Sequence, residues 1–449
     1  MTFLARLPHS RSTHGKRRVG LVRRLARRLP VLVAQVVLAM GPSQMPAFAQ
    51  TACGPGAYAA PDGDFVVLVA SPAVPAPALR YLFRDGRRGA TSDPAAPLAC
   101  VAGEVRVQGR AWQRTVFRET PATFHSAGTA MNGVLIEPTG GESKPPLVVM
   151  VHGSERTSPV GGVYGYAMAA QGISVFVYDK RGTGKSGGEY TQNFELLATD
   201  AANALETAHH LAAGRHGRAG FYGGSQGGWV APLAAARTQA DFVAIGFGLV
   251  ASPIEEDREQ MVSEVRSAGG GAEAEALVNR LSQVTAKLLL SGFRQGYDEL
   301  DAVRREMAGT SWAAKIEGEH SGAIARMPNN ELRRIGRARF DNLELIWDHD
   351  AVQPLRQLRS PLLWVLAGED REAPIETTRN ALLALAQEGK PVDLYLFPDT
   401  DHGMVEFTTH SDGSRSPTRI TDGYLKLIGD WIKGGVSGPY GRGEKLTSH

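Results

Sequence analysis

Six short and almost wholly apolar runs recur between residues 147 and 397, and stretches with a helical period separate several of them. The runs are Leu147–Val151, Ile173–Tyr178, Ala219–Tyr222, Phe242–Phe247, Leu362–Leu366 and Val392–Phe397. Continuous apolar runs of this length are typical of parallel strands that are covered on both faces. The alternation with helices therefore predicts an α/β fold with a mostly parallel central sheet and helices on both of its faces.

Two segments depart from this alternation. Between residues 254 and 347 the apolar spacing is purely helical, which predicts a helical insertion between two strands of the sheet. Residues 50–120 are rich in Ala, Pro and Gly and contain short β-prone stretches, so they predict a small, mostly β N-terminal module. The α/β core is then expected to comprise residues 121–253 and 348–437.

The first 49 residues have the three-part layout of a secretory signal peptide. Nine basic residues and no acidic one precede an apolar run from Leu29 to Met40, and Ala47-Phe48-Ala49 offers small residues to a signal peptidase. The run is too short to cross a bilayer. We therefore predict cleavage after Ala49, a periplasmic or secreted protein, and no stable membrane anchor after cleavage. A membrane-anchored N-terminus is the alternative, and the Sec and twin-arginine export routes both stay open.

The predicted cleavage after Ala49 determines how the charge and the cysteines of the chain are interpreted. Residues 50–449 hold 40 basic and 46 acidic residues, and this mildly acidic body argues against a nucleic-acid partner. The two cysteines, Cys53 and Cys100, both follow the predicted cleavage site, so in an oxidising compartment we expect them to form a disulfide. The alternative is a pair of buried free thiols. No CxxC motif or histidine cluster accompanies them, so neither a metal nor another cofactor is predicted.

The strongest chemical signal is Gly223-Gly224-Ser225-Gln226-Gly227, which lies between an apolar strand and a helix-prone stretch. A G-x-S-x-G sequence in this context is a nucleophile elbow, in which a strained turn projects the serine hydroxyl above the sheet. The start of the helix places the N–H of Gln226 where a developing oxyanion can accept from it. Ser225 is therefore the predicted nucleophile.

A serine nucleophile needs a base, and the base needs an orienting acid. Asp370 follows the strand that ends at Leu366, and it is the predicted acid, with Glu369 and Glu372 as alternatives. His402 follows the next strand on a turn-rich loop, and it is the predicted base, with His410 as the nearest rival. All three groups are expected at the same edge of the sheet.

The second oxyanion donor is expected from the loop after an earlier strand. Val151-His152-Gly153-Ser154 fits this role, and the N–H of Ser154 is the predicted donor. The segment Gly182-Thr183-Gly184-Lys185-Ser186-Gly187 matches nucleotide-binding patterns literally. Aspartate stands where a P-loop needs its first glycine, and an acidic residue does not close the next strand, so nucleotide binding is not predicted.

These blocks together resemble the α/β-hydrolase superfamily, especially secreted bacterial esterase-like serine hydrolases, over about Pro121 to Lys433. The resemblance implies the α/β-hydrolase fold, a triad of Ser225, Asp370 and His402, and oxyanion amides at Ser154 and Gln226. It also implies that the helical insertion is a cap that roofs the pocket. One departure is Ser154-Glu155, which stands where some lipases and esterases carry further glycines, so two oxyanion donors rather than three are expected.

The predicted function is a serine hydrolase, expected to be a carboxylesterase that forms an acyl-enzyme from a small-molecule ester. The alternative is an aminopeptidase or amidase of the same fold, for which Glu155 is the available partner for a substrate amine. A non-catalytic binding protein is a third reading. The sequence assigns neither the oligomeric state nor the role of the N-terminal module.

Overall fold

The computed structural model describes residues 53–71, 73–74 and 76–446 of the chain. The predicted signal peptide and its cleavage site after Ala49 lie outside the described residues. Within those ranges, none of the helices combines the length and the hydropathy of a membrane-spanning segment.

The centre of the protein is a sheet that, within the described residues, has nine strands in the order β19-β15-β14-β13-β12-β10-β11-β9-β8. Their bounds are β8 (Phe117–Ser126), β9 (Thr129–Pro138), β10 (Leu147–Val151), β11 (Ser174–Tyr178), β12 (Ala219–Gly224), β13 (Phe242–Gly246), β14 (Leu362–Ala367), β15 (Val392–Phe397) and β19 (Glu444–Leu446). Neighbours from β11 across to β15 are parallel, whereas β8, β9 and β19 pair antiparallel at the two edges. The predicted mostly parallel sheet is confirmed.

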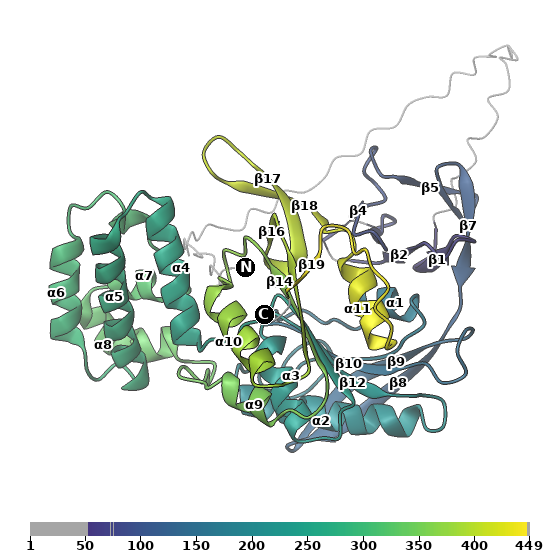
Figure 1. Cartoon of the computed structure of the whole chain (residues 1–449), viewed down its shortest axis with the longest axis horizontal. Helices are drawn as coiled ribbons and strands as arrows, with labels where there is room; N and C mark the ends of the chain where they lie inside the picture. Colours follow the sequence, from purple (N-terminus) through teal and green to yellow (C-terminus); the bar gives the residue numbers. More distant parts are fainter. Residues whose placement is uncertain (1–52, 72, 75, 447–449) are drawn as a thin grey trace, which may run out of the picture. The chain divides into compact units, whose positions relative to one another are not determined.

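Helices cover both faces of this sheet, as predicted (Figure 1). One face carries α2 (Phe194–Leu211), α3 (Gly227–Ala236), α9 (Val352–Gln357) and α10 (Glu376–Gln387). The other carries α1 (Val163–Ala169) and α11 (Tyr424–Ile432). Every residue of β10, β11 and β14 is buried, because apolar side chains on alternate faces meet helices on both sides.

The register of the central strands brings three loops to one edge of the sheet. Leu147 at the start of β10 lies opposite Ser174 of β11 and Ala219 of β12. Since these strands run parallel, their carboxyl ends finish side by side. The loops that follow β10, β11 and β12 therefore share one edge, where functional groups of open α/β sheets are usually found.

The N-terminal module is an antiparallel sheet in the order β4-β3-β2-β1-β7-β6-β5. Its strands are β1 (Gly56–Ala59), β2 (Phe65–Val69), β3 (Arg80–Phe83), β4 (Arg88–Ala90), β5 (Leu98–Val101), β6 (Glu104–Val107) and β7 (Arg110–Thr115). Side chains of β2 alternate between two cores. Val66 and Leu68 pack inside the module, whereas Phe65 and Val67 pack in the core that contains α1 and α11. The boundary predicted at residue 121 falls inside β8.

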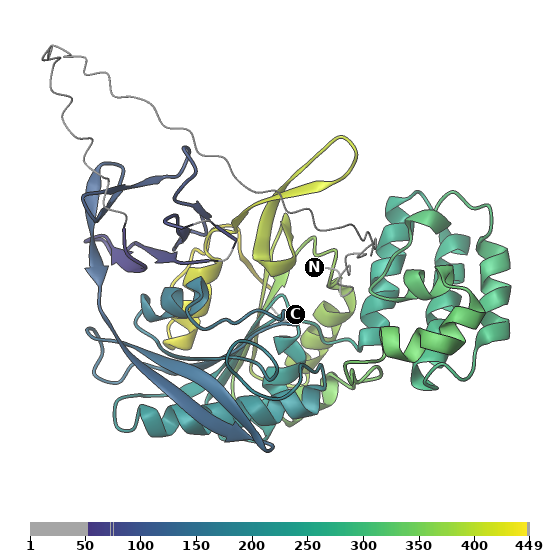
Figure 2. The same cartoon turned by 180° about the vertical axis from the view of Figure 1, so that it is seen from behind.

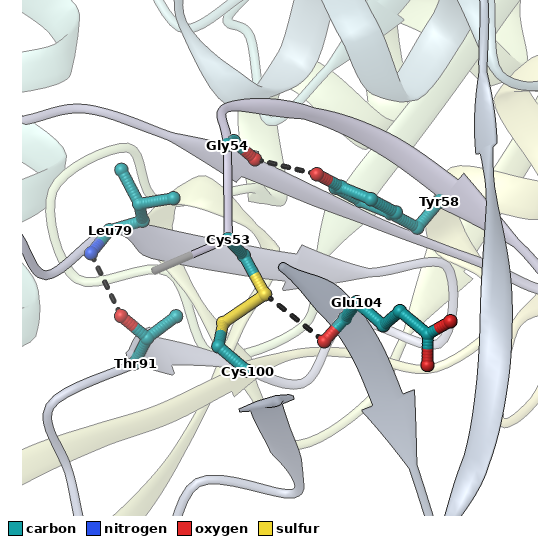
Figure 3. The surroundings of a disulfide bond; sticks show 7 residues. All are labelled: Cys53, Gly54, Tyr58, Leu79, Thr91, Cys100 and Glu104. Carbon is teal, nitrogen blue, oxygen red and sulfur yellow. Dashed lines mark hydrogen bonds between the residues drawn. A yellow bond between two sulfur atoms is a disulfide. The ribbon is translucent and has the colours of Figure 1, made fainter. Parts of the chain in front are cut away.

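A disulfide joins Cys53, just before β1, to Cys100 in β5 (Figure 3). Their Cα atoms lie 5.3 Å apart, although the two residues are separated by 47 positions in the sequence. Cys53 is buried beside Tyr58, Val66 and Leu98, so the bond lies against the small core of the module. The predicted cysteine pairing is confirmed.

Removing this bond is expected to destabilise the module. Closing a loop of 47 residues reduces the entropy of the unfolded chain, which corresponds to about 4 kcal/mol of stability in the chain-entropy model. Dithiothreitol should therefore lower the Tm of the purified protein in a thermal melt. The double variant Cys53→Ser/Cys100→Ser is the control, because its Tm should already be low and should not respond to reductant. An equal Tm in all four samples would contradict a stabilising bond.

The helical insertion comprises α4 (Pro253–Ser267), α5 (Ala272–Leu290), α6 (Tyr297–Met307), α7 (Ser321–Arg326) and α8 (Asn329–Phe340). It begins with a capping box in which Ser252 and Glu255 bond reciprocally to each other's backbone N–H, and Pro253 opens the helix. The N–H of Ile254 donates to the carbonyl of Trp347 at 3.3 Å, so the two ends of the insertion are joined. Figures 1 and 2 show its helices grouped on the α10 side of the sheet.

A small third sheet follows the central one. It consists of β16 (Thr400–Asp401), β17 (Val405–Thr409) and β18 (Arg415–Ile420), and a single 3-10 turn, His402–Met404, separates β16 from β17. The N–H of Ile420 donates to the carbonyl of Gly86 in the N-terminal module at 3.0 Å. The hairpin that follows His402 is therefore anchored to the module.

Candidate active site

Ser225 lies in a turn of two residues between β12, which ends at Gly224, and α3, which begins at Gly227. Its φ of 53° is in the left-handed region, which is strained for a residue with a side chain by about 1–3 kcal/mol. The turn also needs glycine at its flanks. A Cβ on Gly223 would lie 2.8 Å from the carbonyl oxygen of Gly227, and a Cβ on Gly227 would lie 2.7 Å from that of Val151.

The structure brings Ser225, His402 and Asp370 together from three different loops. Ser225 Oγ lies 3.0 Å from His402 Nε2, and His402 Nδ1 lies 2.9 Å from Asp370 Oδ2. The other oxygen of Asp370 accepts the N–H groups of Glu372 and Ala373, at 3.0 and 2.7 Å. The carboxylate is therefore fixed by its own loop and oriented toward the imidazole.

The rival residues from the sequence lie elsewhere. The carboxylate of Glu369 pairs with Arg415 on the neighbouring hairpin. His410 lies near the hairpin tip, with Nε2 2.7 Å from Ser416 Oγ. Glu372 is also close to His402, but its Oε1 lies 3.9 Å from Nε2, the nitrogen that faces Ser225. The contact to Nδ1 is made by Asp370.

Carboxylates determine the protonation of the imidazole. Burial by itself would lower the pKa of His402, but the carboxylates of Asp370 and Glu372 raise it to about 9. Burial raises the pKa of Asp370 above its ordinary value, and its hydrogen bond with His402 opposes that rise. Phe247 packs edge-on against the imidazole with ring centroids 5.1 Å apart, which holds the ring in its plane.

The loop after β10 lies directly against the serine. A Cβ on Gly153 would be 3.2 Å from Cβ of Ser225 and 2.8 Å from the Glu155 carboxylate, so this position needs glycine. Among the described residues, neither the N–H of Ser154 nor that of Gln226 donates to a protein acceptor. Burial and Lys180 lower the pKa of His152 to about 4, so its ring is neutral.

Two acidic side chains that the sequence did not single out, Glu256 and Glu319, gather with Glu372 near the imidazole. Glu256 of α4 is 92% buried, and the charges that act most strongly on it are all carboxylates, those of Glu319, Glu372, Asp257 and Asp370. Burial and these neighbours raise the pKa of Glu256 well above its ordinary value. Burial, Glu372 and Asp257 raise the pKa of Glu319 to about 8. We call Glu256, Glu319 and Glu372 the carboxylate cluster.

The members of the carboxylate cluster come from distant parts of the chain. Glu256 lies in the first turn of α4, Glu319 precedes α7, and Glu372 follows β14. In the sequence, Glu255-Glu256-Asp257 is indistinguishable from the acidic first turn that stabilises many helices. A cavity of about 290 Å³ adjoins the site and is lined by Glu372, His402, Phe407 and Arg415, among others.

The glycine-rich turn after β11 is filled by a side chain of the protein itself. The carboxylate of Asp179 accepts the Lys185 N–H at 2.8 Å and the Asn132 amide at 2.9 Å, and a Cβ on Gly184 would lie 2.3 Å from it. The carboxylate therefore occupies the position that a phosphate would need. Next to it, Arg181 makes two hydrogen bonds to the buried Asp200, at 2.7 and 2.6 Å.

In the ranges that the structure describes, no group of three or more His, Cys, Asp or Glu side chains is arranged to hold a metal ion.

Comparison with known proteins gives one family and several distant structures. A family model described as "Serine aminopeptidase, S33" matches residues 143–405, which is more than half of the chain. No curated protein sequence matches. The Pyrococcus furiosus esterase Pf2001 is similar at 13% identity and a TM-score of 0.39, over 64% of this chain and 85% of that one. The Pyrococcus horikoshii acylaminoacyl peptidase is similar at 16% identity and a TM-score of 0.40, over 73% of this chain and 44% of that one.

Proposed function

The chain belongs to the S33 serine aminopeptidase family and has the α/β-hydrolase fold, and from this premise we propose that it is a serine hydrolase that cleaves carboxylic esters through an acyl-enzyme. The observation that carries the proposal is the 3.0 Å contact between Ser225 Oγ and His402 Nε2 in a strained turn. Family membership alone does not select ester over amide substrates.

Each group then has one role in the reaction. His402 takes the proton of Ser225 Oγ as this oxygen attacks the substrate carbonyl carbon, and Asp370 stabilises the imidazolium. The N–H groups of Ser154 and Gln226 donate to the oxyanion of the tetrahedral intermediate. His402 next gives its proton to the leaving alcohol, which breaks the ester bond. Water, activated by His402, then hydrolyses the acyl-enzyme and releases the acid and free Ser225.

The proposal is tested with p-nitrophenyl esters of increasing acyl length together with a fluorophosphonate probe. We expect release of p-nitrophenol and a covalent adduct on the peptide that contains Ser225, identified by mass spectrometry. A protein that neither turns over any ester nor reacts with the probe would be a binding protein rather than an enzyme.

The carboxylate cluster favours a second candidate function, hydrolysis of an aminoacyl amide or ester with a free amino group. Burial and neighbouring carboxylates raise the pKa values of Glu256 and Glu319, and an ammonium group bound beside them would relieve this repulsion. The cluster adjoins the nitrogen of His402 that faces Ser225. An ammonium bound there would lie near the scissile bond. Glu155, the amine partner inferred from the sequence, lies on the loop after β10, where its Oε1 is 3.7 Å from His152 Nδ1 and its carboxylate is also close to Gly153.

The two candidates differ in their response to the substrate amine. If the cluster binds ammonium, an aminoacyl p-nitroanilide should be hydrolysed at least about tenfold better than its N-acetyl derivative, and Glu256→Gln should reduce this preference by raising KM. Glu273→Gln, at an exposed glutamate of α5, is the control and should change nothing. Equal rates for free and acetylated substrates, together with faster ester hydrolysis, would exclude the second candidate and support ester hydrolysis.

We also propose that the protein is exported to the periplasm or the medium. The disulfide between Cys53 and Cys100 supports this, since such bonds persist mainly in oxidising compartments.

A further inference from the structure

Lys180, in the loop after β11, contacts both segments that carry the proposed oxyanion donors. Its Nζ donates to the carbonyl oxygen of Gly153 at 2.5 Å and to Oε1 of Gln226 at 3.3 Å. The first acceptor belongs to the loop after β10, and the second belongs to the residue that follows Ser225. One ammonium group therefore links the loops after β10, β11 and β12 at the edge of the sheet where Ser225 lies.

The contact with Gly153 acts on the oxyanion donor itself. The carbonyl of Gly153 and the N–H of Ser154 belong to the same planar peptide group. A charged donor on the oxygen fixes the orientation of that plane, and it polarises the group so that its N–H becomes a stronger donor. The hydroxyl of Tyr190 donates to the next carbonyl, that of Ser154. The peptide units on both sides of Ser154 are thus held through their oxygens.

The burial of this ammonium has no structural explanation in the sheet. Lys180 is 97% buried, and its described hydrogen bonds go to neutral oxygens rather than to a carboxylate. Burial lowers its pKa to about 8, with Glu155 opposing the shift and Arg156 adding to it. The Tyr190 ring centroid lies 5.0 Å from Nζ, and the neutral His152 is a further neighbour of Lys180. A buried ammonium whose hydrogen bonds go to neutral oxygens is unfavourable, and such groups are concentrated at functional sites.

We propose that Lys180 is a positioning residue that holds the N–H groups of Ser154 and Gln226 in the geometry needed to bind the oxyanion. This inference rests on the proposed serine hydrolase function. Lys180 does not touch the substrate and transfers no proton. Its effect is confined to states that carry a negative oxygen, namely the transition states and tetrahedral intermediates, and it does not extend to the bound ester.

The test compares Lys180→Met with the wild-type protein. Methionine fills nearly the same volume without the charge or the donor. We expect kcat for a p-nitrophenyl ester to fall by about 10- to 100-fold while KM changes less than about threefold, since removing a full oxyanion donor typically lowers kcat by about 10²- to 10³-fold. Affinity for a boronic acid inhibitor, which forms a tetrahedral anion on the serine, should fall by a similar factor. A merely structural role would not affect these two readouts selectively.

Two further variants make the result decisive. Lys180→Gln retains an N–H donor for the Gly153 carbonyl and should recover part of kcat. If a thermal melt shows that Lys180→Met is poorly folded, kcat and boronate affinity are compared in Lys180→Gln instead. Lys185→Met changes an exposed lysine of the same loop and should match the wild type. Wild-type kcat and boronate affinity in both Lys180 variants would overturn the positioning role. A wild-type protein that the fluorophosphonate probe does not label would instead overturn the proposed function, and this inference with it.

Discussion

Ser225→Ala is expected to reduce kcat/KM for p-nitrophenyl esters by at least about 10⁴-fold, because the acyl-enzyme needs an oxygen nucleophile that alanine lacks. The oxyanion donors and His402 would remain in place. The small residual rate should reflect direct attack by water, which these groups can still assist. Initial rates at saturating and sub-saturating ester give kcat and kcat/KM separately.

The variant should fold normally, since alanine and serine are similarly strained at a φ of 53°. An unchanged Tm would then separate loss of chemistry from loss of structure. Ser143→Ala, at an exposed serine before β10, is the matched control and should keep full activity and full labelling by the fluorophosphonate probe. Retention of ester hydrolysis by Ser225→Ala would place the nucleophile at another residue.

The central strands could be predicted because both faces of each strand are covered and therefore both require apolar side chains. Strands such as β10 and β14 are buried on both sides, so every position must be apolar and the run stands out in the sequence. The hairpin of β8 and β9 lacks this signal. In β8 most side chains are exposed or half-buried, and its pattern includes Arg118, Glu119 and a proline. Its place in the sheet depends on pairing with β9, which no local pattern specifies.

The proposed catalytic residues were accessible to sequence analysis for a related reason. Each follows a strand of a parallel sheet, so chain order and sheet geometry already place them at one edge. The carboxylate cluster had no such signal, because Glu256 and Glu319 reach the site through the packing of the insertion on the core. The sequence analysis missed Lys180 for a different reason. Its loop resembles a phosphate-binding turn, and its contact with Gly153 exists only because β10 and β11 are neighbours.

Asp370→Asn is expected to lower kcat by about 10⁴-fold, although the substituted side chain is almost the same shape. The carboxylate accepts the Nδ1–H of His402 and thereby leaves Nε2 free to take the proton of Ser225. An amide can donate to Nδ1, which favours the tautomer with the proton on Nε2, and that tautomer cannot act as the base. Glu369→Gln is the control. Its carboxylate pairs with Arg415, so activity should stay within about threefold of wild type.

The pH dependence of the same variant distinguishes loss of the orienting acid from a general loss of structure. His402 acts as a base only when neutral, and Asp370 and Glu372 raise its pKa to about 9. For the wild type, deprotonation of His402 should therefore give kcat/KM a rising limb that extends to about pH 9, and loss of the Lys180 charge, whose pKa is about 8, should reduce the height of that limb. In Asp370→Asn one of these charges is gone, the pKa of His402 falls, and the rising limb should move to lower pH even as the maximum rate drops. Profiles measured from pH 5 to 10 would contradict the assignment if the limb stayed in place, because the carboxylate that controls the imidazole would then lie elsewhere.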